Sequence, residues 1–135
     1  MKLLLDTNAY SALMRGEPAV VERVHQAEKL FLSAVVVGEL LYGFRHGQRY
    51  EVNRRQLEQF LASRFVEFLP VSVTTADRFG LIAAALRRKG QPIPLNDIWI
   101  AAHALETGAD LLTDDDHFAA VEGLSLLTFS AGQGG

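Results

Sequence analysis

Short apolar segments alternate with longer amphipathic ones along almost the whole chain, and this alternation constrains the fold more than any other feature. Apolar residues in the longer segments recur every three or four positions, which is typical of helices. Because helical crossovers join parallel strands, we expect an α/β fold, a three-layer α/β/α arrangement with a mostly parallel central sheet. The strands are predicted at 2–5, at 30–33, within 65–73, at 109–113 and at 124–129.

Capping signals predict several helix boundaries. Thr74 with Asp77 resembles a capping box, in which side chains satisfy free backbone N–H groups, so a helix is expected to begin there. A short helix at 117–121 is expected to be capped by one acidic residue of the turn before it. The other helices are predicted at 9–14, from Pro18 onward, at 34–44 and at 50–63.

The most informative helix–strand unit runs from Pro94 to Phe118. Asp97 stands where its helix should begin, Gly108 ends that helix, and the triplet 114–116 is Asp-Asp-Asp. A helix from Asp97 to position 107 descends about 16 Å, and the strand that follows climbs back about 13–16 Å. Asp97 and this acidic turn (residues 114–116) should therefore meet at one level of the fold.

Composition indicates one globular domain at 1–130, followed by a flexible tail at 131–135. Hydrophobic residues make up 49% of the 135 positions and charged residues 21%. The chain has no cysteine, which excludes disulfides and thiolate metal sites and favours a cytoplasmic location. No apolar stretch is long enough to cross a membrane, so no membrane association is expected. The net charge of −3 decides neither for nor against a nucleic-acid partner.

Carboxylates occur at three strand-end or helix-start positions and inside one apolar helix. Taken alone, Asp6 and Asp97 are ordinary helix caps, and the acidic turn is an ordinary solvated turn. Glu39 is less ordinary, because an apolar helix surrounds it and its carboxylate needs either a partner or a route to the surface. Together these acids predict a cation site at the carboxyl edge of the sheet, and oxygen ligands suit Mg²⁺, or Mn²⁺, rather than Zn²⁺.

Other catalytic classes have weaker support. The four histidines include no His-x-x-x-His pair, so a zinc hydrolase is not expected, and these histidines are interpreted as structural or surface residues. No serine lies in a G-x-S-x-G setting, and no glycine-rich phosphate loop is present. A phosphotransfer enzyme with Asp6 as nucleophile is a weak alternative, because Asn8 stands where such enzymes often carry a second acid.

Three segments together resemble the PIN-domain ribonucleases, and more narrowly the VapC toxins of bacterial toxin–antitoxin pairs. The resemblance covers nearly the whole chain and implies a PIN fold, RNA as substrate, a homodimer, and a cognate antitoxin that projects a basic side chain into the acidic site. An alternative is a catalytically weak PIN-like binding module in a regulatory complex. The segments are LLLDTNAYSALMRG, SAVVVGELLYG and PLNDIWIAAHALETGADLLTDDDHF.

The resemblance also assigns roles to individual residues. The fourth acid is placed at Asp115 because a Thr-x-Asp-x-x-Phe pattern fits there, although the neighbouring Asp114 and Asp116 are alternatives. The residues expected to support the ligands are Asn8, Thr113 and Asp114. The catalytic and metal-binding acids implied are Asp6, Glu39, Asp97 and Asp115.

A hydrolytic mechanism follows from such a cluster. Asp6, Asp97 and either Glu39 or Asp115 would hold a divalent cation that activates a water molecule, and the remaining carboxylate would orient that water toward the RNA phosphodiester. Basic residues around the helix after Glu39 could hold RNA phosphates, although such a group is more often a solvated face. These residues are Arg45, Arg49, Arg54 and Arg55.

Overall fold

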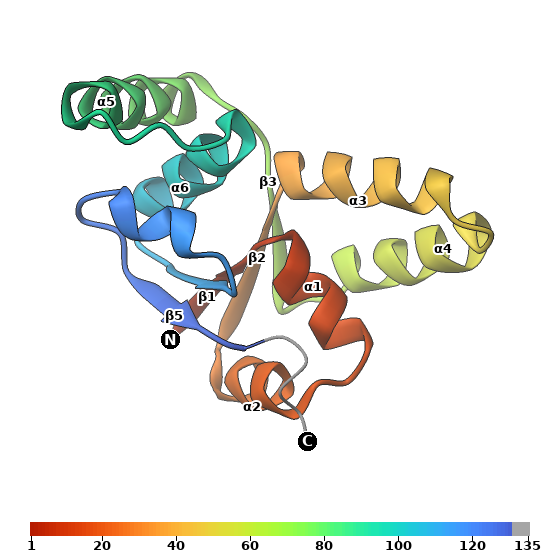
Figure 1. Cartoon of the computed structure of the whole chain (residues 1–135). Coiled ribbons are helices and arrows are strands. Elements are labelled where there is room, and N and C mark those ends of the chain that lie inside the picture. Colours follow the sequence, from red (N-terminus) through yellow and green to blue (C-terminus); the bar gives the residue numbers. More distant parts are fainter. Residues whose placement is uncertain (131–135) are drawn as a thin grey trace.

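The computed structural model describes residues 1–130, and its core is a five-stranded sheet in the order β3-β2-β1-β4-β5 (Figure 1). All four strand pairings are parallel, which confirms the predicted α/β fold. The flexible tail predicted at 131–135 lies outside the described residues. The strands are β1 (Lys2–Leu5), β2 (Lys29–Ser33), β3 (Val66–Leu69), β4 (Asp110–Thr113) and β5 (Leu126–Thr128).

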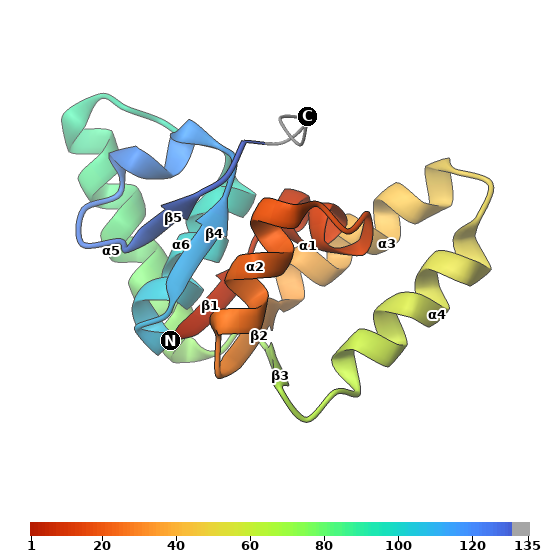
Figure 2. The same cartoon turned by 90° about the horizontal axis from the view of Figure 1, so that it is seen from below.

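Helices cover both faces of the sheet, giving the expected three layers. α5, α6 and η1 lie on one side, α1 and α2 lie on the other, and α3 with α4 forms a hairpin that extends beyond β2 and β3 (Figures 1 and 2). This arrangement places helix starts at the carboxyl ends of β1 and β2. The helices are α1 (Thr7–Met14), α2 (Pro18–Gln26), α3 (Ala34–His46), α4 (Tyr50–Leu61), α5 (Val73–Lys89), α6 (Leu95–Thr107) and the 3₁₀ helix η1 (Asp116–Ala120).

The central strands explain why the apolar runs are continuous rather than alternating. Leu3, Leu4 and Leu5 of β1 have no solvent exposure, and neither do Leu111 and Leu112 of β4. A parallel strand with helices on both faces buries successive side chains in opposite directions, so its interior positions are apolar on both sides. The polar residues of these strands, Lys2, Asp110 and Thr113, lie at the strand ends.

The capping box predicted from Thr74 and Asp77 is wrong. The cap lies two residues earlier, at Ser72, α5 begins at Val73, and the reciprocal partner is Thr75. The pair Ser72–Thr75 forms the capping box because Thr75 is fully buried. Its hydroxyl also donates to Glu106 Oε1 (2.6 Å). Asp77 is exposed and instead forms a surface ion pair within its own helix.

Several other boundaries differ from those predicted. α1 begins at Thr7 rather than at residue 9, because the Asp6 side chain caps it. α6 begins at Leu95, so Asp97 lies in the first turn of that helix rather than at its start. The β3 and β5 strands are shorter than the segments predicted for them, and α3 continues to His46. Among the described residues, no helix has both the length and the apolar character that a membrane span requires.

Candidate active site at the carboxyl edge of the sheet

The sheet register brings distant acidic segments together at one edge. Leu5 of β1 pairs with Leu112 of β4, so Asp6 and Thr113 follow side by side at the ends of neighbouring strands. α3 begins where β2 ends, and Glu39 lies in its second turn. The predicted meeting of Asp97 with the acidic turn is confirmed, because α6 and β4 have the lengths that return the chain to the same level.

Asp6 is buried, with 5% of its surface exposed, and it has two structural contacts. Its Oδ1 accepts the Ala9 N–H (2.8 Å) as the cap of α1, and its Oδ2 accepts the hydroxyl of Thr113. Burial raises the pKa of this carboxyl to about 6; the two hydrogen bonds oppose the rise, and the charges of Asp114 and Asp97 add to it. The capping interpretation is thus correct and incomplete, since a cap alone does not require this burial.

Glu39 is half-buried and has two donors of its own. The Thr7 hydroxyl donates to its Oε1 (2.6 Å), and the Asn96 side-chain amide donates to its Oε2 (3.3 Å). The carboxylate is therefore held in place rather than extended into solvent. Sequence reasoning assigned no role in the site to Thr7 or Asn96, although each adjoins a predicted acid, and that adjacency was the only available signal.

The acidic turn separates into three different environments. Asn8 Nδ2 donates to Asp114 Oδ1 (3.0 Å), which places Asp114 on the Asp6 side of the site. The Asp115 N–H donates to Thr113 Oγ1 (3.0 Å), so Thr113 contacts both Asp6 and Asp115. Asp116 is exposed and begins η1. The expectation that an acid of this turn caps a short helix is confirmed, and the cap is Asp115.

Asp97, Asp115 and His117 form the tightest group of potential metal ligands among the described residues. One oxygen or nitrogen from each lies within 4.8 Å of the other two. His117 Nδ1 lies 3.0 Å from Asp115 Oδ1 and 3.3 Å from Asp97 Oδ2. Burial and the charge of Asp115 raise the pKa of Asp97, with a further contribution from Glu39, while His117 lowers it. Because the charge of Asp97 also raises the pKa of Asp6, four separate segments influence one another through charge.

His117 was not predicted as part of the site. Sequence reasoning treated the histidines as structural or surface residues, because no metal-binding histidine pair was present. The usable signal was its position two residues after Asp115: the His117 N–H donates to Asp115 Oδ1 (2.8 Å), and this contact holds its ring near the carboxylates. A histidine beside a capping acid was too common a pattern to single out.

The donor set fits a divalent cation. Asp97 and Asp115 converge without a lysine or arginine that forms an ion pair with either of them in residues 1–130. Like charges held this close are unfavourable unless a proton or a cation lies among them. The chemistry of these groups, carboxylate oxygens with one imidazole nitrogen, matches the ligands that such ions take in proteins.

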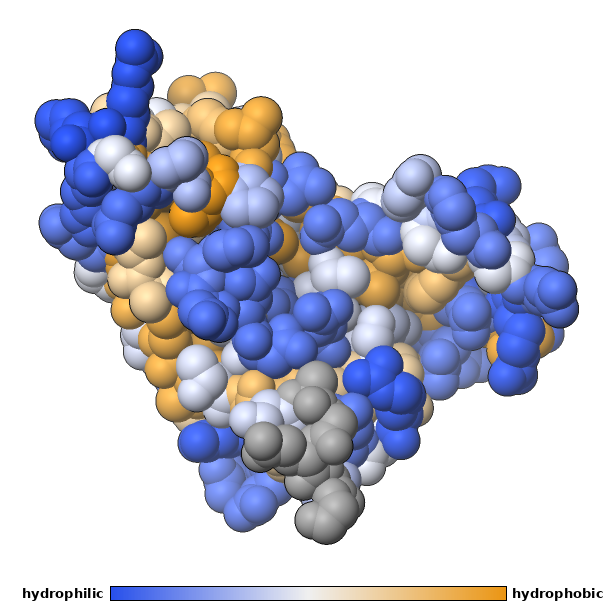
Figure 3. Space-filling view, in the orientation of Figure 1, coloured by the Kyte–Doolittle hydropathy of each residue, from blue (hydrophilic) through white to orange (hydrophobic). Residues whose placement is uncertain are grey.

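The arginines considered as RNA contacts lie on the α3–α4 hairpin rather than among the acids. Arg45 lies over the ring of Tyr50, at 4.3 Å from its centre, and donates to the Tyr50 hydroxyl (2.9 Å). Arg54 pairs with Glu58 (3.1 Å) one helical turn away, whereas Arg49 and Arg55 are exposed. Figure 3 shows hydrophilic residues gathered between the α5 region and this hairpin, over the acidic turn and η1.

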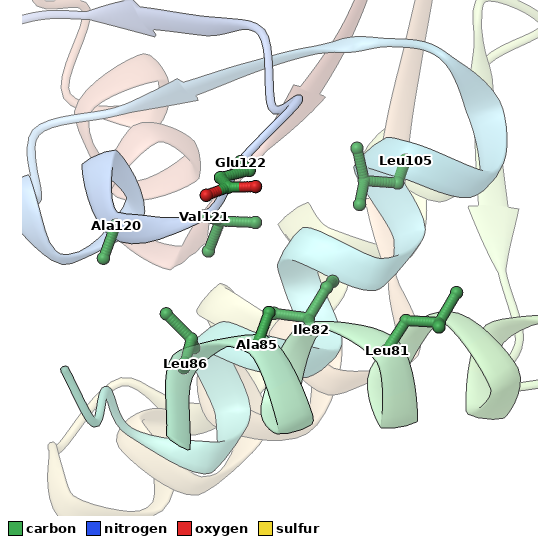
Figure 4. Close-up of a pocket in the computed structure, with 8 residues that line it drawn as sticks. All are labelled: Leu81, Ile82, Ala85, Leu86, Leu105, Ala120, Val121 and Glu122. Atoms are coloured by element: carbon green, nitrogen blue, oxygen red, sulfur yellow. The ribbon is translucent and has the colours of Figure 1, made fainter. Parts of the chain in front are cut away.

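An apolar pocket elsewhere does not share this chemistry. It lies between α5, α6 and the end of η1, as Figure 4 shows, and its apolar lining includes Leu81, Ile82, Leu86 and Val121. Its only charged residue is Glu122, which pairs with Lys89 at 3.3 Å. The pocket therefore lacks the convergent acids that mark the carboxyl edge.

Comparison with known proteins gives one consistent family. The PIN domain model matches residues 3–124. Ribonuclease VapC1 of Haemophilus influenzae (strain R2866) is 36% identical over 117 residues, which is 84% of this chain and 86% of that protein. The tRNA(fMet)-specific endonuclease VapC of Shigella flexneri is 33% identical over 127 residues, covering 92% of this chain and 95% of the relative.

A solved structure agrees with these relatives. VapBC-1 from nontypeable Haemophilus influenzae superposes with a TM-score of 0.83 and 32% identity, covering 95% of this chain and 98% of the other. The match includes every segment that contributes an acid to the site, since the family model spans residues 3–124. The chain therefore belongs to the PIN-domain family, in the branch formed by the VapC ribonucleases.

Proposed function

We propose that this protein is a metal-dependent endoribonuclease and the toxin of a toxin–antitoxin pair. The observation that carries the proposal is the convergence of Asp6, Glu39, Asp97 and Asp115 at the carboxyl edge, where burial and mutual repulsion raise the pKa of two of these acids. Carboxylates held in this state favour a bound cation. The ribonuclease relatives support RNA as the substrate.

The acidic side chains have different roles in the proposed reaction. A bound divalent cation would polarise a phosphate oxygen and acidify a water molecule. Asp97 and Asp115, whose oxygens lie within 4.8 Å of each other, would hold that cation together with Asp6, whose pKa the charge of Asp97 raises. Glu39, held by hydrogen bonds from Thr7 and Asn96, would orient the attacking water and take up its proton.

Supporting contacts keep this arrangement in place. Thr113 donates to Asp6 and accepts from the backbone of Asp115, so it joins two of the acids. Asn8 fixes Asp114, whose charge acts on Asp6. We assign these three residues, Asn8, Thr113 and Asp114, to positioning rather than to direct contact with the substrate. Preorganised groups of this kind contribute by removing reorganisation during the reaction.

The partners follow from the family. The solved relative is VapBC-1, and we propose a cognate antitoxin and a homodimer for this chain as well. The Shigella relative is named for cleavage of tRNA(fMet), which supports structured RNA as the first substrate to test. Arg49 and Arg55 are exposed and have neither an ion pair nor a side-chain hydrogen bond among residues 1–130, which makes them the best candidates on the hairpin for phosphate contacts.

The test is cleavage of tRNA by the purified protein with Mg²⁺ or Mn²⁺, with EDTA as the metal-free arm. Asp6→Asn should abolish cleavage while circular dichroism shows an intact fold, and Asp77→Asn, an exposed acid on α5, serves as the matched control. A phosphatase substrate is tested in parallel, because its hydrolysis would indicate a phosphotransfer enzyme rather than a ribonuclease. Cleavage that persists in EDTA or in Asp6→Asn would refute the assignment, and antitoxin binding without cleavage under any metal would favour a binding module.

A further inference from the structure

His117 approaches two carboxylates at once. Its Nδ1 lies 3.0 Å from Asp115 Oδ1 and 3.3 Å from Asp97 Oδ2. Neighbouring ligands of one octahedral ion with bonds near 2.1 Å lie about 3 Å apart. The two distances from His117 Nδ1 are therefore those of adjacent ligands around a common centre.

The local backbone holds His117 in this position. Its N–H donates to Asp115 Oδ1 (2.8 Å), and the next residue, Phe118, is anchored in the core with 1% exposure. The His117 side chain itself is 54% exposed. One ring nitrogen can thus face the carboxylates while solvent and a phosphate group retain access from the open side.

We infer that His117 is a further ligand of the ion held by Asp97 and Asp115, and that this makes the site a mixed nitrogen–oxygen centre which prefers Mn²⁺ to Mg²⁺. The inference deepens the proposed function, because it concerns the ion on which that function depends. Imidazole nitrogen suits first-row transition ions, whereas Mg²⁺ is bound almost entirely through oxygen. An oxygen-only set, which the sequence alone suggested, suits both Mg²⁺ and Mn²⁺.

A competing arrangement makes the opposite prediction. A protonated His117 could itself serve as the cation between Asp97 and Asp115, and it would then exclude a metal ion. Removing the ring would in that case strengthen Mn²⁺ binding. Ligation instead predicts weaker binding, so the direction of the change separates the two arrangements.

The experiment measures Mn²⁺ affinity by electron paramagnetic resonance and Mg²⁺ affinity by competition, without RNA. The native protein should bind Mn²⁺ at least about 10-fold more tightly than Mg²⁺, and His117→Ala should lose about 10-fold in Mn²⁺ affinity with a much smaller loss for Mg²⁺. Electron spin echo modulation from a ligand nitrogen should appear in the native protein and vanish in His117→Ala. His25→Ala, an exposed histidine on α2, is the matched control.

The outcomes distinguish this inference from the proposed function. Unchanged or tighter Mn²⁺ binding in His117→Ala, no nitrogen modulation, or no measurable Mn²⁺ binding by the native protein would overturn the ligand assignment. Mn²⁺ binding through His117 without any RNA cleavage would leave the assignment standing and count against the ribonuclease. Metal-dependent cleavage with an unaltered metal preference in His117→Ala would support the ribonuclease and contradict the ligand assignment.

Discussion

Helix α6 carries two polar sites six residues apart, and they are compensated in opposite ways. His103, in the middle of the helix, is completely buried, while Asp97, in the first turn, is half-buried. His103 Nε2 donates to the Pro70 carbonyl (3.0 Å), and its Nδ1 lies 2.9 Å from Ser33 Oγ. Asp97 has only His117 as a hydrogen-bonding partner for its side chain among the described residues.

The His103 network is complete within the protein. The Pro70 carbonyl can only accept, so the ring hydrogen is on Nε2, and Nδ1 can accept the Ser33 hydroxyl. Ser33 Oγ also accepts the Val35 N–H (3.0 Å) as the cap of α3. Every polar atom of this set has a partner and no ionised group is needed. Such a network joins β2, α3 and the segment before α5, which is a structural task.

The Asp97 site is not complete in this sense. Burial and the charges of Asp115 and Glu39 raise its pKa, and only His117 acts in the opposite direction. A fold gains nothing from collecting like charges in a partly buried place. Polar groups satisfied within the chain thus serve the architecture, whereas uncompensated charge indicates a ligand from outside.

The largest effect expected from this difference is on catalysis. Asp97→Asn should lower the turnover of RNA by at least about 1,000-fold, equivalent to about 4 kcal/mol, because a metal ligand is lost. Its unfolding free energy in EDTA should be unchanged or higher, since a source of repulsion is removed. Single-turnover cleavage and urea denaturation are the measurements. A variant that is both inactive and strongly destabilised would show that Asp97 is structural, as His103 is.

His103→Ala should behave in the opposite way. Loss of a fully buried ring and of two hydrogen bonds should destabilise the protein by roughly 3 to 4 kcal/mol, measured by urea denaturation. Cleavage by the molecules that remain folded should stay within about threefold of native activity. His46→Ala, at the exposed end of α3, is the control. A stable but inactive His103→Ala protein would contradict the division between the two sites.

The buried acid Asp6 predicts a pH-dependent effect of intermediate size. Its folded pKa of about 6 exceeds the ordinary 3.8, so the folded state binds the proton more tightly and loses stability as pH rises between these values. Asp6→Asn in EDTA should therefore be more stable than the native protein above pH 6, by up to about 3 kcal/mol.

This difference should shrink as the pH falls through these values and approach zero below about pH 3, because the carboxyl is then protonated in both states. Added Mn²⁺ should narrow the gap at high pH, since a cation stabilises the charged form. Urea denaturation of both proteins across this range is the measurement. A stability difference of the same size at every pH would mean that desolvation of Asp6 is not its source.

The smallest effect concerns the donors that hold Glu39. Thr7→Val removes the hydroxyl that donates to Glu39 Oε1 while keeping the side-chain shape, and kcat should fall by about 10-fold, or about 1.4 kcal/mol, with KM unchanged. Thr74→Val, an exposed threonine in the first turn of α5, is the control. An increase in KM with unchanged kcat would place Thr7 in RNA binding instead.

Local patterns accounted for most of the elements. Continuous apolar runs predicted the buried parallel strands, and Gly108 predicted the end of α6, because these signals depend on residues that are neighbours in the chain. The capping box failed because two candidate pairs overlapped in the sequence. Burial of Thr75 against Glu106, which lies 31 residues away, selected between them.

The candidate site likewise contains residues that the sequence predicted and contacts that only the tertiary structure shows. Asp6, Glu39 and Asp97 stood out because a strand end, an apolar helix and a helix start are all visible in the sequence. The partners of these acids were less visible: Thr113 was named only through the family resemblance, and Thr7 was given no role. Thr7 contacts Glu39 across 32 positions, and Thr113 contacts Asp6 across 107, so both contacts depend on how the strands are ordered and aligned.

By itself, the sequence determined the alternation of strands and helices and the presence of acids at their junctions, since hydrophobic periodicity and chain breaks act over a few residues. Only the tertiary structure decided that β1 lies between β2 and β4, that Asp115 rather than Asp116 faces Asp97, and that His117 joins them. These features arise from packing between distant segments, where register and side-chain direction select the contacts.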